Sequence, residues 1–420
     1  MTKLINWMTD VFAPRANKIA RNPWVAAIQE SILTAMPVIL IGSFATLFNV
    51  LRDFLPFLPD LGLISSFSFG LLSLFLAYLI PATVMEKKRH KRVVRQAGLA
   101  GIALFLIIIS PIFDEEGNIL VAFGRLGTEG MLATLISGLF VAAVMNFFAK
   151  HSFFKKDSEM PDFITVWFDT LIPITLILVV GWVSTYLLNF SVFEFINWVF
   201  SPFIAGGQSF LGFVLFNFLA FSFLYSFGIS TWVLYPVMAA ILFQGFGDNL
   251  ALVAAGESAK YIHTNEVLNM FLIGGGGTTL ALNIMMLGAK SKKLKAVGRS
   301  SIVPSIFNIN EPLVFGAPMA FNPLLMIPMW IVGLVGPILT YVAFSSGFLA
   351  IPLEPFWLWY LPSPIVGYIV TNSIKGAIVV LIIFAASWLI YYPFYRAYDK
   401  QLCAEEVAAA QSASAKKSDK

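Results

Sequence analysis

Two stretches decide the fold of this chain: NMFLIGGGGTTLALNIMML at residues 269–287 and NINEPLVFGAPMAFNP at residues 308–323. Both are apolar, yet glycine, proline and asparagine interrupt the helical pattern in each. Backbone that leaves the helix at membrane depth survives only where protein covers it or where it lines a wet cavity. Apolar segments interrupted in this way are the best sequence indication of a transporter's binding site. We therefore expect two re-entrant hairpins, at residues 268–289 and 300–323, that meet near a central site.

The composition around these stretches indicates an integral membrane protein. Of the 420 residues, 58% are hydrophobic and only 12% are charged, and the mean hydropathy is +0.82. A soluble domain carries about 25% charged residues, because its surface faces water, whereas a surface that faces lipid needs few. The 41 phenylalanines and ten tryptophans suit apolar packing and membrane interfaces.

Long apolar runs predict an all-α fold, since a spanning helix needs roughly 20 apolar residues. The clearest runs are residues 31–52, 62–85, 97–113, 129–149, 171–190, 208–227, 229–247, 324–349 and 374–395. With the irregular region from 195 to 325, we expect about ten transmembrane helices plus the two re-entrant hairpins. Residues 1–400 are expected to form a single membrane transport domain, and residues 401–420 a short, polar, disordered tail.

The charges of the loops alternate along the chain. The N-terminal segment is basic, residues 53–60 carry no lysine or arginine, and residues 86–95 (EKKRHKRVVR) are strongly basic. Residues 114–118 (DEEGN) are acidic, and the loop after residue 149 again carries lysines. Because basic loops stay on the cytoplasmic side, both termini are expected to be cytoplasmic. The same distribution explains the net charge of +4 and the pI near 9.0 without nucleic-acid binding.

Glu311 is the first candidate for chemistry. A carboxylate in an apolar segment is costly unless it is paired or solvated, so it is a functional hypothesis by default. Asn308 and Asn310 add amide groups beside it, and Pro312 prevents a regular helix. A carboxylate flanked by amides suits a polyhydroxyl ligand. The alternative is a structural carboxylate neutralised by a nearby arginine or lysine.

Other candidates have weaker support. The glycines at 274–277 lack the spacing of a nucleotide-binding loop. Two alternatives remain: a tight hairpin whose backbone amides approach a ligand, or close packing of helices without a ligand. Glu30 either lines the pathway or lies at the cytoplasmic interface beside Arg21, and the second reading is favoured. His263 either lies near the site or is an ordinary loop histidine. No metal-ligand spacing and no nucleophile motif is present, so no metal or cofactor is expected.

The sequence resembles the membrane (IIC) component of bacterial phosphoenolpyruvate-dependent sugar phosphotransferase systems, in the lactose/cellobiose/chitobiose family. IGGGGTTLAL (273–282) resembles the family's IGGSGATLGL. PSIFNINEPLVFGAPMAFNP (304–323) resembles its PGIFNINEPIIFGLPIVLNP almost position by position. Weaker likenesses are MPVILIGS (36–43), MPDFITVWFDTLIP (160–173) and WYLPSPIVGYI (359–369).

The resemblance implies a homodimer in the bacterial cytoplasmic membrane, whose sugar site lies between a scaffold part and a moving part that contains the two hairpins. The sugar, of the β-linked disaccharide type, receives a phosphoryl group from a phosphocysteine on a separate IIB protein, which a IIA protein supplies. The family's NEP glutamate, which holds or activates the sugar hydroxyl, matches Glu311. Cys403 lies outside any phosphate-cradling loop, so the phosphoryl-carrying cysteine is not expected in this chain.

One departure concerns a histidine that faces the sugar in the family's Gly-Ile-His-Gly sequence. The matching stretch here reads FGIST, with Ser230 at the histidine position. A serine still bonds a hydroxyl but takes no proton near neutral pH. The residues expected to bind the solute are Glu311, Asn308, Asn310, Ser230, Thr231, Gly275, Gly276, Thr278 and His263.

Three classes of function follow from these observations. The first is a sugar permease whose cargo is phosphorylated by IIB, with Glu311 as the catalytic residue. The second is a facilitator or ion-coupled carrier of the same fold that never phosphorylates its cargo, and Ser230 keeps this alternative open. The third is a membrane sensor or scaffold in which Glu311 is structural.

Overall fold

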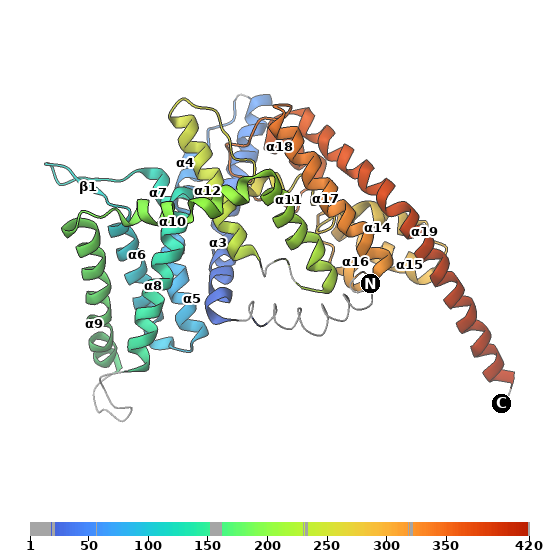
Figure 1. Cartoon of the computed structure of the whole chain (residues 1–420), viewed down its shortest axis with the longest axis horizontal. Helices are drawn as coiled ribbons and strands as arrows, with labels where there is room; N and C mark the ends of the chain where they lie inside the picture. The colour runs from blue at the N-terminus through green and yellow to red at the C-terminus, as the bar shows by residue number, and fades with distance from the viewer. Residues whose placement is uncertain are drawn as a thin grey trace. The chain divides into compact units, whose positions relative to one another are not determined.

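The computed structural model describes residues 18, 22–55, 57–151, 162–229, 231, 234–317, 319 and 322–418, and these are almost entirely helical (Figure 1). They divide into two compact units, and the single membrane transport domain over residues 1–400 stays a prediction. The bundle unit contains Lys18–Gln208 and Tyr235–Thr264, and the hairpin unit contains Ser209–Leu234 and Asn265–Lys420. The chain passes between the units after residues 208, 234 and 264.

The bundle unit consists of helices with one small two-stranded hairpin. Its α-helices are α3 (Pro23–Phe54), α4 (Gly62–Phe67), α5 (Leu72–Lys87), α6 (Val94–Ile108), α7 (Phe123–Leu126), α8 (Met131–Lys150), α9 (Asp162–Trp182), α10 (Val192–Gln208) and α12 (Tyr235–Ala254). Its shorter elements are η2 (Phe69–Leu71), η3 (Lys91–Val93), η4 (Thr128–Gly130), the π-helical turn η5 (Val183–Leu187), β1 (Ile112–Phe113) and β2 (Ile119–Leu120). Helices α5, α6, α8 and α9 pack side by side (Figure 1).

The hairpin unit contains both interrupted segments. Its α-helices are α11 (Phe210–Phe218), α13 (Asn265–Leu268), α14 (Leu280–Leu287), α15 (Lys292–Ile306), α16 (Glu311–Gly316), α17 (Pro323–Ser345), α18 (Ser363–Thr371) and α19 (Ile374–Ser418). The π-helical turn η6 (Leu219–Phe223) and the 3-10 helix η7 (Tyr225–Phe227) continue α11. An apolar core packs α14, α16, α17 and α19 together.

Eight helices of the described residues are long and apolar enough to span a membrane: Pro23–Gly42, Gly62–Lys87, Thr128–Lys150, Ile164–Leu187, Phe210–Phe227, Tyr235–Ala254, Pro323–Ser345 and Ile374–Ala408. Eight of the nine apolar runs found in the sequence correspond to these helices. The ninth, residues 97–113, corresponds to α6, which has only 15 residues. It stops at Ile108 because Ser110 has a positive φ and precedes Pro111, which disfavours helical backbone at Ser110.

The basic residues 87–95 lie at one end of the bundle unit, which we call the basic end. Lys87, at the end of α5, pairs with Glu30 of α3, and the ammonium of Lys88 lies 5.6 Å from the ring centroid of Trp24. The ring of His90 hydrogen-bonds Asn146 of α8 at 3.1 Å. The N-terminal end of α3 and the C-terminal ends of α5 and α8 therefore lie together, as the alternation of loop charges requires.

The acidic loop lies at the opposite end of these helices, where β1 and β2 pair antiparallel with Ile112 opposite Leu120 (Figure 1). Asp114 accepts hydrogen bonds from the backbone and side chain of Asn118. These bonds, the side-chain bond foremost, lower the pKa of Asp114 below its usual value. The loop therefore keeps its negative charge at the end away from the lysines.

Helix α19 extends through Ser418 and so includes residues 401–418 of the segment that we expect to be a polar tail. Asp399 accepts hydrogen bonds from the backbone N–H groups of Lys290 and Ser291, at 3.1 and 2.9 Å. Glu406 accepts from the backbone of Lys292 and Lys293, at 3.1 and 3.0 Å. The first N–H groups of a helix have no partner within it, so these two carboxylates complete the start of α15 and hold α19 against it.

Candidate functional site

The first interrupted segment turns sharply between α13 and α14. The backbone takes positive φ at Gly274, Gly275, Gly277 and Thr278. A side chain at Gly275 is excluded on two grounds, because its φ is +93° and a Cβ there would lie 2.6 Å from the side chain of Asn310. The hydroxyl of Thr278 donates to the carbonyl of Phe271 at 2.5 Å, so Thr278 ties the turn together.

The second interrupted segment breaks between α15 and α16. Helix α15 ends at Ile306, and Asn308 takes a left-handed conformation with φ of +61°. Asparagine tolerates this conformation better than other residues with a side chain. The chain becomes helical again at Glu311, with Pro312 in the first turn of α16. The sequence prediction that both segments leave the helix and meet each other is confirmed by the contacts of Asn308 and Asn310.

Asn308 uses its whole side-chain amide to fasten three segments of the hairpin unit. Its Oδ1 accepts from the backbone N–H of Gly274 at 2.8 Å and from the hydroxyl of Ser363 at 3.1 Å. Its Nδ2 donates to the carbonyls of Trp359 and Leu361 at 2.6 and 2.9 Å. An amide has two donors and two acceptor positions, and all four are occupied. Asn308 therefore clamps these segments together, and its contact with the solute stays a prediction.

Asn310 makes a second clamp beside the first. Its Nδ2 donates to the carbonyl of Gly276 at 2.7 Å and to the hydroxyl of Thr279 at 2.9 Å. Its Oδ1 accepts from the hydroxyl of Tyr225 at 3.0 Å. Asn310 is only 3% exposed, so both of its donors are committed to the protein. Gly276 is partly buried, and its carbonyl oxygen accepts the hydrogen bond from Asn310.

Glu311 follows these two clamps directly and differs from them in exposure. It is the first residue of α16 and is exposed, and among the described residues its carboxylate has no hydrogen bond or ion pair. It lies close enough to the hydroxyl of Tyr225 to interact with it electrostatically. The alternative in which a lysine or arginine neutralises Glu311 therefore has no support from the described residues. The carboxylate of Glu311 thus lies at the break between α15 and α16, directly after a backbone segment that Asn308 and Asn310 hold in place.

Two buried tyrosines belong to the same network, and sequence reasoning missed both. Tyr225 bonds Asn310, and Tyr391 of α19 donates from its hydroxyl to the carbonyl of Gly277 at 2.7 Å. Tyr391 is completely buried. A buried tyrosine needs a partner for its hydroxyl, but nothing in the sequence around residue 391 says that this partner is a turn more than one hundred residues earlier.

His263 lies in the bundle unit and is completely buried. Its Nδ1 lies 2.8 Å from the carbonyl oxygen of Gly207, which can only accept, so Nδ1 carries the proton. The side chain of Gln208 bonds both the N–H and the carbonyl of His263, at 2.8 and 2.9 Å. Burial lowers the pKa of His263 to about 4, which keeps the ring neutral at pH 7. The structure therefore favours the structural reading of this histidine over solute binding.

The remaining candidates are resolved to different degrees. Ser230 lies outside the described residues, and Thr231 is a partly buried residue of the segment after η7. Glu30 pairs with Lys87 at the basic end, in agreement with the interfacial reading, while Arg21 lies outside the described residues.

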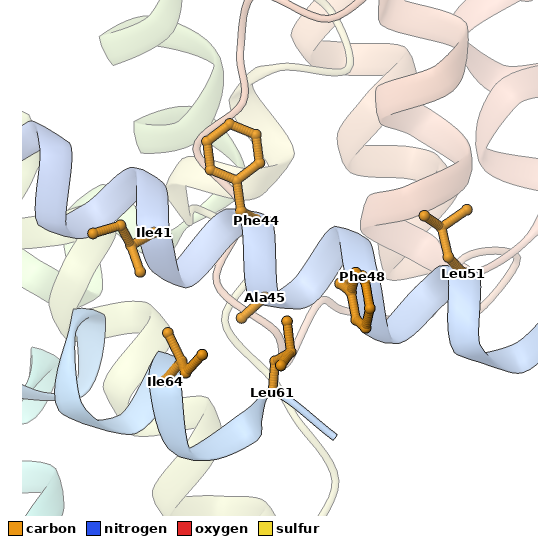
Figure 2. A pocket seen from close by; sticks show the side chains of 7 residues that line it. All are labelled: Ile41, Phe44, Ala45, Phe48, Leu51, Leu61 and Ile64. Carbon is orange, nitrogen blue, oxygen red and sulfur yellow. The ribbon is translucent and has the colours of Figure 1, made fainter. Parts of the chain in front are cut away.

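A cavity of about 330 Å³ in the bundle unit has the wrong chemistry for a polar solute. Figure 2 shows its lining from α3 and the segment around α4. Every lining side chain is a hydrocarbon: Ile41, Phe44, Ala45, Phe48, Leu51, Leu61 and Ile64. A sugar needs hydrogen-bonding groups that fix its orientation, and this cavity has none in its lining.

Long apolar helices around two interlocked, interrupted segments that present a carboxylate define a polytopic membrane transporter. The sequence matches the family described as "Phosphotransferase system, EIIC" over residues 29–333. The chain therefore belongs to this family and is a sugar permease (IIC) component of a phosphotransferase system, which confirms the resemblance seen in the sequence.

Individual relatives agree with the family assignment over nearly the whole chain. The cellobiose-specific EIIC component of Geobacillus stearothermophilus is 31% identical over 444 residues, which cover 97% of each chain. The lichenan permease IIC component of Bacillus subtilis (strain 168) is 28% identical over 435 residues, covering 97% of this chain and 96% of the relative. The crystal structure of the transporter ChbC, the IIC component from the N,N'-diacetylchitobiose-specific phosphotransferase system, has a TM-score of 0.85 at 27% identity and covers 95% of this chain and 99% of that chain.

The clamping role of Asn310 is tested by the isosteric substitution Asn310→Asp. It keeps the side-chain shape but removes both donors and places carboxylate oxygens against the acceptors at Gly276 and Thr279. A buried polar group without a partner costs about 1–3 kcal/mol, so we expect a lower midpoint of thermal unfolding in detergent. Asn372→Asp, at an exposed residue at the C-terminal end of α18, is the matched control and is expected to lower the midpoint less, because water solvates its new carboxylate. Equal midpoints for the two variants would contradict the clamp.

Proposed function

We propose that Glu311 is the residue at which the sugar is held and prepared for phosphorylation. The observation that carries this proposal is the contrast among three neighbours. Asn308 and Asn310 are fastened to the protein through their side chains, whereas the carboxylate of Glu311 is exposed and has no hydrogen bond or ion pair among the described residues. The clamps restrict the backbone on which Glu311 stands. Preorganisation of this kind favours precise contact with a ligand hydroxyl.

The proposed chemistry needs only one proton acceptor from this chain. The sugar hydroxyl donates a hydrogen bond to the carboxylate of Glu311, which takes the proton as the hydroxyl oxygen attacks the phosphorus atom. The new O–P bond forms while the S–P bond to the phosphocysteine of a IIB protein breaks, and the sulfur leaves as a thiolate. A positioned general base of this kind contributes typically 10²–10⁴ in rate.

The proposed cargo is a β-linked disaccharide. The relatives are named for cellobiose, lichenan and N,N'-diacetylchitobiose, and their likeness covers 95–97% of this chain. A carboxylate accepts hydrogen bonds from hydroxyl groups of any of these sugars, so Glu311 itself does not discriminate among them. Among the residues that we expect to contact the sugar, Ser230, Thr231, Gly275, Gly276 and Thr278 remain proposals, with the two turn glycines contributing backbone groups.

The test of Glu311 is the substitution Glu311→Gln, which keeps the shape but removes the base. In vesicles with phosphorylated IIB protein inside, we expect phosphorylation of radiolabelled cellobiose or chitobiose to slow by about 100-fold or more. Glu257→Gln removes an exposed carboxylate outside the hairpin segments and is expected to behave as the unsubstituted chain.

Two outcomes would overturn this proposal in different ways. Full phosphorylation by Glu311→Gln would remove Glu311 from the chemistry. Equilibration of free sugar at the same rate with and without IIB would instead identify a facilitator, and Ser230→His would then be the informative substitution, because it restores the family's histidine.

We further propose that the chain lies in the bacterial cytoplasmic membrane with the basic end and both termini on the cytoplasmic side. The separation of the lysine-rich basic end from the acidic β1–β2 loop supports this orientation. In a Cys403→Ser background, Glu116→Cys is expected to react with a membrane-impermeant maleimide in intact cells. Arg89→Cys is expected to react only after the cells are permeabilised, and the reverse pattern would invert the topology.

The family resemblance also supports a homodimer. Light scattering of the purified chain in detergent, corrected for bound detergent, is expected to give twice the 46.3 kDa mass of one chain. A protein mass that stays at one chain over the whole concentration range would rule the dimer out.

A further inference from the structure

A second cavity, of about 790 Å³, lies at the basic end of the bundle unit. It is lined from the end of α5, from η3 and the first turns of α6, and from the start of α9. The lining residues are Glu86, Lys91, Arg92, Val94, Arg95, Gln96, Val166 and Trp167. Its volume falls within the range of about 300–1,000 Å³ that is typical of small-molecule sites.

The charge of this lining is positive, because Lys91, Arg92 and Arg95 face a single carboxylate, Glu86. Neither Lys91 nor Arg95 forms an ion pair or hydrogen bond within the described part of the chain, and both are exposed. The neighbouring cations on the other side of the same loop do have partners, since Lys87 pairs with Glu30 and Lys88 lies over Trp24. Lys91 and Arg95 are therefore two cations of the cavity that are available to an external anion.

The other wall of the cavity is apolar and lies at the start of a candidate spanning helix. The spanning part of α9 begins at Ile164, so Val166 and Trp167 lie in its first turn, where tryptophan typically marks the interface. Trp167 is 64% exposed, and Phe168 and Leu171, further along α9, are 52% and 60% exposed. These large apolar side chains continue from the cavity toward the middle of the spanning helix.

We propose that this cavity binds the phosphodiester headgroup of an anionic glycerophospholipid, with the acyl chains along the outer face of α9. The cations supply the partners that a phosphate needs, and basic pockets between membrane helices bind anionic headgroups in this way. A soluble anion would use the charged wall alone. Only a lipid also uses the exposed apolar surface that begins at Trp167.

The experiment is a titration of the purified full-length chain, in a non-ionic detergent, with phosphatidylglycerol followed by native mass spectrometry. Phosphatidylcholine with the same acyl chains is the neutral probe. Each cation near an anionic lipid contributes a factor of about five in binding, so the double variant Lys91→Gln, Arg95→Gln is expected to bind phosphatidylglycerol about 25-fold more weakly. The charge-keeping variant Lys91→Arg, Arg95→Lys is expected to retain binding.

The matched control removes two exposed cations from the same end but outside the cavity, Arg89→Gln with Lys150→Gln, and is expected to retain binding. Phosphatidylglycerol brominated in its acyl chains is expected to quench tryptophan fluorescence less in Trp167→Phe than in the unsubstituted chain. Equal losses in the two double variants, or equal binding of phosphatidylcholine, would overturn the proposal. Displacement of the lipid by millimolar inorganic phosphate would also overturn it, because the site would then be one for a soluble anion.

Discussion

A backbone group that leaves the helix inside a membrane has no water to bond, and the protein must satisfy it from within. In this chain two asparagine side chains meet much of that requirement. Asn308 makes four hydrogen bonds and Asn310 makes three, and together they join the turn at Gly274–Gly277 to the break before α16. The two interrupted segments therefore form one structure, in which each supplies the partners that the other lacks.

The position of Glu311 is a consequence of this arrangement. Helix α15, which leads to the break, is fixed at its start by Asp399 and Glu406 of α19. Past the end of α15, Asn308 is bound to the carbonyls of Trp359 and Leu361. The backbone that leads to Glu311 is thus held at the start of α15, at Asn308 and at Asn310, and Glu311 is the charged residue that directly follows these contacts. An exposed carboxylate on a restrained backbone loses little further freedom when it binds a ligand, which is a direct advantage for binding.

The sequence was sufficient for the membrane class, the interrupted segments and their meeting, because composition and helix-breaking residues act locally. The sequence did not predict the roles of Asn308 and Asn310. An amide side chain hydrogen-bonds a sugar hydroxyl or a backbone carbonyl equally well, and only the fold determines which of these partners lies beside it. The helical end of α19 escaped prediction for a similar reason. Asp399 lies just before the predicted polar tail and Glu406 lies within it, and their partners at the start of α15 are more than one hundred residues away in the sequence. The interleaved units and the buried His263 likewise depend on contacts between distant segments.

The basic end shows how one local sequence signal serves more than one physical purpose. Orientation in the membrane depends on the number of lysine and arginine residues in the loop. It does not depend on the direction of each side chain. In the structure the cations of residues 87–95 are nevertheless divided. Lys87 and Lys88 contact Glu30 and Trp24 of α3, whereas Lys91, Arg92 and Arg95 line a cavity beside Trp167. Orientation in the membrane does not require any of these cations to line a cavity. Their position at the cavity is therefore a separate feature of the structure, which the total charge of the loop does not predict.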